Sequence, residues 1–136
     1  MLRKLILTAS IAAVAFGAET RVTFLRDVAP ILNKVGCTSG TCHGAAKGKN
    51  GFKLSLRGYD PQFDYEALLY DLSGRRFNRA EPGKSLMLAK PSQEIAHGGG
   101  QRFTKDSDYY KIIYAWIAQG VPFGDRSEER RVGKEC

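Results

Sequence analysis

The segment Cys37-Thr-Ser-Gly-Thr-Cys42-His43 constrains the fold of this chain more than any other. Two cysteines close together, the second followed at once by a histidine, form the pattern that anchors c-type haem. Each residue has a part in that chemistry. The two thiols add across the vinyl groups of the porphyrin as thioethers, and the adjacent imidazole reaches the iron. The motif therefore predicts one covalent haem c, with Cys37, Cys42 and His43 as binding residues.

The spacing within the motif is wider than usual. Four residues separate Cys37 from Cys42, whereas the common pattern has two. This wider form occurs in some multihaem cytochromes. Gly36, Gly40 and Gly44 surround the motif, and glycine allows an enlarged loop to turn tightly and to approach a flat ring.

Three other readings of the motif stay open. The first is a disulfide between Cys37 and Cys42, which an exported chain can form. The second is a zinc site, although the available ligands are only Cys37, Cys42, His43 and the distant His97. The third is a thioredoxin-like redox pair, which requires two intervening residues and a βαβ pattern that the sequence lacks.

Residues 1–18 are predicted to be a secretory signal peptide. Arg3 and Lys4 precede an apolar run from Leu5 to Phe16, and small residues permit cleavage after Gly17 or after Ala18. An uncleaved anchor is the alternative, but the run is shorter than the roughly 20 residues that span a bilayer. The chain is therefore expected in the periplasm, on the cell surface or secreted, with no membrane insertion after cleavage.

One small domain, residues 19–125, is expected after the signal peptide. Residues 126–136 form a charged segment without apolar periodicity that ends on Cys136. This segment is interpreted as an unstructured, non-native tail that resembles translated adapter sequence, or else as a solvated charged tail. The natural protein is expected to continue beyond residue 125.

The composition narrows the possible functions. The chain carries a formal net charge of +7, of which residues 19–125, with 15 basic and 11 acidic residues, hold +4. This mildly basic balance suggests weak steering toward acidic partners. Its basic residues are spread out without interleaved aromatic residues, so nucleic acid is not an expected partner. No catalytic triad, phosphate loop or carboxylate pair is evident, and two histidines leave few groups for acid–base catalysis. An electron-transfer module is therefore expected rather than an enzyme.

The apolar pattern predicts an all-α domain. Residues 24–35 carry an apolar stripe at helical spacing, interrupted by Pro30, and lead directly to Cys37. A loop or short strand is expected at residues 44–60. Three further helices are predicted: residues 64–72 with Asp64 as N-cap, residues 86–90 capped by Ser85, and residues 108–119 ended by Gly120.

Three stretches together carry a family resemblance. They are Val22-Thr-Phe-Leu-Arg-Asp-Val-Ala-Pro-Ile-Leu, Cys-His-Gly-Ala-Ala-Lys-Gly-Lys-Asn-Gly-Phe-Lys-Leu-Ser-Leu-Arg-Gly-Tyr-Asp and Tyr-Ala-Trp-Ile-Ala-Gln-Gly-Val-Pro. Over residues 21–123 the chain resembles the planctomycete-type cytochrome c domain. The resemblance implies a small class I cytochrome c-like fold, with helices around one covalent haem and the N- and C-terminal helices packed together. It also implies fusion to downstream domains of a larger exported protein, or a separate redox partner protein.

The second axial ligand of the iron has two candidates. His97 lies before three glycines in an irregular segment, and it occupies the place where related domains carry a distal methionine. Met87 lies in a helical apolar segment, where a thioether is most often core filler. His97 is therefore the predicted ligand, with His43 as the other metal ligand. An exposed loop histidine is the alternative.

Four arginines are candidates to pair with the haem propionates through forked hydrogen bonds, or are solvated surface charges: Arg75, Arg76, Arg79 and Arg102. Three functions remain open at this level. They are electron transfer, sensing of a small gas at the haem, and a haem-free interaction module held by a disulfide.

Overall fold

The computed structural model describes residues 20–124. The predicted signal peptide and C-terminal tail lie outside the described residues. Between residues 20 and 124 the secondary structure consists of a π-helical turn, three 3₁₀ turns and four α-helices, and the single β feature there is an isolated bridge between Lys49 and Phe52. In chain order the elements are η1 (Phe24–Val28), α1 (Ala29–Lys34), η2 (Leu56–Gly58), α2 (Pro61–Tyr70), η3 (Asp71–Gly74), η4 (Pro82–Lys84), α3 (Leu86–Ala89) and α4 (Asp108–Ala118). The all-α prediction is thus confirmed for this part of the chain.

The first helical segment is η1 followed directly by α1, and it matches the predicted helix at residues 24–35. Thr23 caps its N-terminus, where its hydroxyl accepts a hydrogen bond from the Arg26 N–H. The wide π-turn precedes Pro30, which lies in the first turn of α1. Because proline has no N–H to donate, the regular hydrogen-bond ladder cannot run unbroken through this point.

The second helix begins earlier than predicted. Asp60, not Asp64, is the N-cap of α2, and its carboxylate accepts from the Phe63 N–H at 3.0 Å. The prediction for Asp64 was wrong because this residue is buried inside the helix and accepts from the Ser55 hydroxyl at 2.9 Å. Pro61 at the first helical position favours the earlier start.

The last two helices follow the predicted positions closely. Ser85 is the N-cap residue of α3, but its hydroxyl makes no cap hydrogen bond and instead accepts from the Asn78 N–H at 3.0 Å. The predicted capping by Ser85 was therefore wrong in its chemistry. Helix α4 ends at Ala118, and Gly120, two residues further on, has a φ of 86°. The Val121 N–H then bonds the Trp116 carbonyl at 3.0 Å, which completes a Schellman cap.

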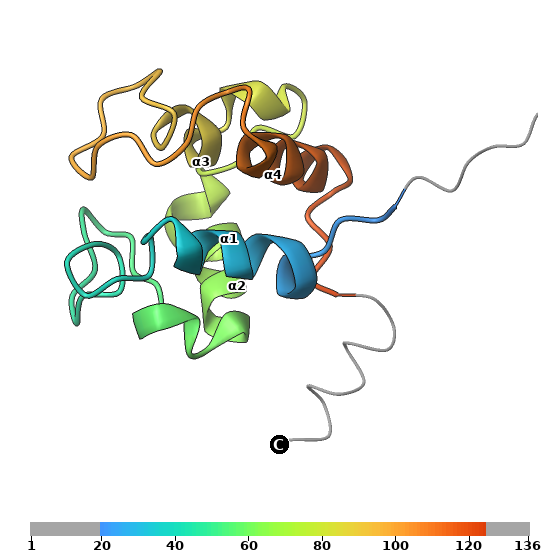
Figure 1. Ribbon diagram of the computed structural model, residues 1–136. Helices are drawn as coiled ribbons and strands as arrows, with labels where there is room; N and C mark the ends of the chain where they lie inside the picture. Colours follow the sequence, from blue (N-terminus) through green and yellow to red (C-terminus); the bar gives the residue numbers. More distant parts are fainter. Residues whose placement is uncertain (1–19, 125–136) are drawn as a thin grey trace, which may run out of the picture.

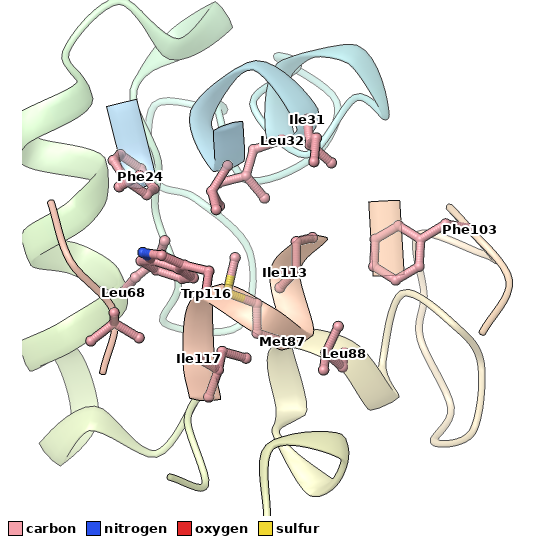
Figure 2. Packing of buried hydrophobic residues seen from close by; sticks show 12 residues of the cluster. Phe24, Ile31, Leu32, Leu68, Met87, Leu88, Phe103, Ile113, Trp116 and Ile117 are labelled. Atoms are coloured by element: carbon pink, nitrogen blue, oxygen red, sulfur yellow. The ribbon is translucent and has the colours of Figure 1, made fainter. Parts of the chain in front are cut away.

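Trp116 lies at the centre of the hydrophobic core and is fully buried. Figure 2 shows side chains from η1, α1, α2, α3 and α4 meeting around it. Its ring centroid lies 5.6 Å from that of Phe24, and its indole N–H donates to the Pro122 carbonyl at 2.9 Å. The contact between Phe24 and Trp116 joins the N-terminal element η1 to the C-terminal helix α4.

Two long loops, residues 35–55 and 91–107, lie on the same side of the molecule (Figure 1, teal and orange). The ends of the described chain lie together on the opposite side. They are joined there by hydrogen bonds from the Phe24 and Leu25 N–H groups to the Pro122 and Phe123 carbonyls. Within residues 20–124, no helix has the length and apolar character needed to cross a bilayer.

Candidate functional site

The end of α1 fixes the position of Cys37. Gly36 has a φ of 82°, and the Cys37 N–H bonds the Leu32 carbonyl at 2.9 Å. Together with the Gly36 N–H bond to the Asn33 carbonyl at 3.1 Å, these contacts form a second Schellman cap. The helix terminus thus turns the chain and delivers the first cysteine beside the side chain of Leu32, and both residues line one cavity.

The rest of the motif folds into a tight loop. The His43 N–H donates to the Cys37 carbonyl at 3.0 Å, and the Cys42 N–H donates to the Ser39 carbonyl at 3.0 Å. Gly44 is packed so closely that a Cβ there would lie 2.0 Å from the Thr38 carbonyl oxygen. Glycine is required at this position because any side chain would collide with backbone.

His43 is held by contacts with the chain that follows it. Its Nδ1 lies 3.1 Å from the Phe52 carbonyl oxygen, and its ring centroid lies 4.6 Å from that of Phe52. Because a carbonyl oxygen can only accept, the proton is on Nδ1 and the lone pair is on Nε2. Partial burial lowers the pKa of His43, which further favours the neutral imidazole.

His97 is presented by the second loop in the same tautomer. Its Nδ1 lies 2.8 Å from the Gly100 carbonyl oxygen, so Nε2 again carries the lone pair. A Cβ on Gly99 would lie 3.2 Å from this Nε2. An imidazole whose other nitrogen donates to a carbonyl is the usual arrangement of a metal-bound histidine.

The two imidazole rings come from different loops and lie close together in nearly parallel planes. Their centroids are 6.4 Å apart and their planes are inclined by 14°. An imidazole nitrogen binds a metal ion such as zinc at about 2.0–2.1 Å, and the ring radius adds about 1.15 Å when ring bonds have near-peptide C–N length. Two rings that bind one ion end-on from opposite sides would therefore have centroids about 6.3–6.5 Å apart. The observed separation fits such a pair.

A cavity of about 540 Å³ contains both imidazoles and both cysteines. This volume is within the range of small-molecule sites. Its walls are largely apolar and come from all four α-helices and both loops. The apolar lining residues are Leu32, Phe52, Leu54, Leu68, Leu72, Leu86, Met87, Pro91, Ala96, Phe103 and Ile113. Both candidate second ligands, His97 and Met87, thus lie at the cavity, but Met87 also belongs to the buried core.

The charged residues of the cavity are all basic. They are Lys49, Arg75, Arg76, Lys90 and Arg102, with no acidic residue among the described residues that line it. Three of the four arginines proposed for propionate binding are thus at the cavity, and Arg79 is not. A ligand with an apolar body and negatively charged groups would complement this lining.

The two thiols have different surroundings. Burial raises the pKa of Cys37 to about 11, even though Arg102 opposes the shift. A hydrogen bond with Ser39 lowers the pKa of Cys42, with a further contribution from Arg102. The Arg102 Nη2 donates to the Cys42 Sγ at 3.4 Å. Both cysteines are free thiols in the structure.

The groups that hold the motif together were only partly predictable. The four predicted site residues, Cys37, Cys42, His43 and His97, all line one cavity. The roles of Phe52 and Arg76 in supporting His43 carry no sequence signal of their own.

Within residues 20–124, no group of three or more His, Cys, Asp or Glu side chains is placed to hold a metal ion.

Comparison with known proteins found no matching family model, no similar curated protein and no similar solved structure.

Proposed function

We propose that this chain is an exported c-type cytochrome module that binds one haem covalently and transfers single electrons. The observation that carries the proposal is the close, nearly parallel pair of imidazoles, His43 and His97, 6.4 Å apart at 14° beside two free thiols. A haem bound there supplies a reversible one-electron couple at its iron. The chain's own residues hold the haem, orient the iron ligands and exclude water.

Each site residue has a separate task in this proposal. Cys37 and Cys42 would hold the haem covalently, since each thiol can add its sulfur to one carbon of a vinyl group and its hydrogen to the other. His43 and His97 would hold the iron through Nε2. An iron held by both imidazoles would have no position open for a substrate, which favours electron transfer over catalysis. The haem potential should also be lower than with a methionine ligand.

The basic lining supports the same ligand. A haem brings two carboxylates with its apolar ring, and Arg75 and Arg102 are available at the cavity to balance these charges. The Arg76 fork adds positive charge there, although its terminal nitrogens already donate to backbone carbonyls. We further propose a class I cytochrome c-like arrangement around the haem, in the periplasm or at the cell surface. Electrons would pass to a redox partner protein or to fused downstream domains of the planctomycete-type architecture.

The direct test is expression with a cytochrome c maturation system. We expect the haem to stay with denatured protein through acid–acetone extraction and to give a thioether-type pyridine haemochrome. The double variant Cys37→Ser/Cys42→Ser should lose haem on extraction. Complete extraction from the wild-type protein would refute covalent attachment and favour the disulfide-held module.

A gas-sensing module is the second candidate, and one observation favours it. Each Nδ1 is held within its own loop, but the His97 Nδ1 bonds the nearby Gly100 carbonyl, whereas the His43 Nδ1 bonds the carbonyl of Phe52, whose ring is in turn stacked on Arg76. An imidazole that is held only by a nearby residue of the same loop is more easily displaced from the iron by a gas molecule. Rapid binding of carbon monoxide to the ferrous wild-type protein would favour sensing, and slow or absent binding would favour electron transfer.

A further inference from the structure

Arg76 is a buried cation that the motif does not include. Its side chain is only 7% exposed. The Nη1 donates to the carbonyls of Ala67 at 3.1 Å and Asp71 at 2.9 Å, and the Nη2 donates to the Gly51 carbonyl at 3.4 Å. One guanidinium thus joins the end of α2 to the turn that precedes Phe52.

The guanidinium also lies against the ring that supports His43. Its central carbon is 3.9 Å from the Phe52 ring centroid, a cation–π contact. The Phe52 ring is in turn 4.6 Å from the His43 ring, at 47°. The Phe52 carbonyl accepts from the His43 Nδ1. Phe52 therefore contacts His43 through both its ring and its backbone. Arg76 supports Phe52 by stacking on its ring and by bonding the carbonyl of the preceding residue, Gly51.

Burying a positive charge of this kind costs folding free energy, because the guanidinium loses its hydration. Burial lowers the pKa of Arg76, and within residues 20–124 its guanidinium donates to carbonyl groups without forming an ion pair with a carboxylate. An apolar side chain of similar size would avoid the desolvation cost. The guanidinium of arginine is planar and permanently charged, so it can donate to three carbonyls and stack on an aromatic ring at the same time.

We propose that Arg76 is a positioning residue that acts through Phe52 to set the tautomer and ring plane of His43. The proposal deepens the proposed haem function and rests on it for its redox consequence. Arg76 also places a fixed positive charge near the iron site. Such a charge favours the reduced state, because reduction removes one positive charge from the iron.

The haem-free protein provides the first test. Nitrogen-15 NMR should find His43 almost entirely as the Nδ1–H tautomer in the wild type. Arg76→Met and Phe52→Leu should both give a mixture of tautomers, while Arg79→Met, which removes an arginine outside the cavity, should not. An unchanged tautomer in folded Arg76→Met and Phe52→Leu would overturn the positioning role, whether or not the protein binds haem.

The haem-loaded protein separates orientation from charge. Arg76→Met should alter the g-value spread of the ferric electron paramagnetic resonance (EPR) signal and lower the reduction potential. Arg76→Lys keeps the charge but not the planar fork, so it should alter the EPR signal with a smaller fall in potential. Arg79→Met should change neither. Covalent haem in every variant, with EPR signals identical to wild type, would overturn the inference while the haem function stands. Absence of haem in the wild type would refute the haem function instead.

If Arg76→Met does not fold, Phe52→Leu still decides the outcome. It keeps Arg76 and the backbone carbonyl but removes the ring between the guanidinium and His43. Its EPR signal should change in the same sense as that of Arg76→Lys. A folded Phe52→Leu protein with the wild-type signal would contradict a route through Phe52.

Discussion

Cys37 and Cys42 are chemically unequal although they share one motif. Burial raises the pKa of Cys37 to about 11, whereas the hydrogen bond with Ser39 lowers the pKa of Cys42. Because the thiolate is the reactive form, Cys42 should be alkylated by iodoacetamide much faster than Cys37 in reduced, haem-free protein at neutral pH. Cys37 should react appreciably only as the pH approaches 11.

Peptide mass mapping after short exposures measures both rates. The same reaction in urea is the control, since unfolding removes the burial of Cys37 and should make the two rates similar. Equal rates in the folded protein would mean that the burial of Cys37 does not control its reactivity.

The two candidate second ligands should respond differently to substitution. His97→Ala should open the distal site, so that the ferric protein becomes high-spin or its potential rises, and the ferrous protein binds carbon monoxide readily. Met87→Leu conserves volume in the core, where Met87 is 8% exposed, and should cost less than about 1.5 kcal/mol with an unchanged spectrum. Loss of the low-spin spectrum in Met87→Leu, but not in His97→Ala, would reverse the assignment.

At the scale of elements, the conformation of the motif loop depends more on Gly44 than on Gly40. A methyl group at Gly44 would lie 2.0 Å from the Thr38 carbonyl oxygen, whereas one at Gly40 would lie 3.6 Å from a Leu56 methyl carbon. Gly44→Ala should therefore destabilise the domain by about 1–3 kcal/mol, as overpacking does, and lower haem incorporation.

Thermal unfolding followed by circular dichroism provides the measurement, with Gly40→Ala as the matched control in the same loop. A loss of about 1 kcal/mol corresponds to roughly 4–8 °C in a domain of this size. Similar melting temperatures for the two variants would show that the loop relaxes around Gly44 at little cost.

The helices also show what a sequence can predict. The terminal helices were predictable because α4 carries a long apolar face closed by Gly120, and because the stripe of α1 leads straight to the motif. The start of α2 was not, because Asp60 and Asp64 both precede apolar residues. Only the fold shows that Asp64 turns inward to Ser55. Local pattern cannot distinguish a capping carboxylate from a buried one.

The same limit applies to the candidate site. The thiols and His43 are adjacent in sequence, and the glycines after His97 mark its loop, so all four residues could be named in advance. Arg76 and Phe52 could not be assigned to His43, because Arg76 reaches Phe52 from a distant segment and Phe52 meets His43 only through the irregular path of the loop at residues 35–55. Long-range side-chain contacts leave no periodic signal.

At the scale of the whole molecule, the cavity lies among the four α-helices and is lined mainly by apolar side chains. Filling it supplies packing contacts that an empty or water-filled space lacks. Haem-free protein, made without the maturation system, should therefore unfold at a markedly lower temperature than the haem-loaded protein.

Differential scanning calorimetry of the two forms makes this comparison. The Cys37→Ser/Cys42→Ser variant without haem is the control for the thiols themselves and should resemble the haem-free wild type. Equal melting temperatures with and without haem would imply that the ligand lies outside the cavity.

The central claim is that His43 and His97 bind one iron from opposite sides with nearly parallel rings. With an angle of 14° between their planes, the π orbitals of both imidazoles would be aligned and would separate the energies of two d orbitals of an iron bound between them. EPR of the ferric wild-type protein tests this most directly. We predict a low-spin, rhombic signal with three resolved g values, and no weak absorption at the red edge of the optical spectrum that marks sulfur ligation. A high-spin signal, or a sulfur-ligation band that disappears in Met87→Leu, would contradict the account.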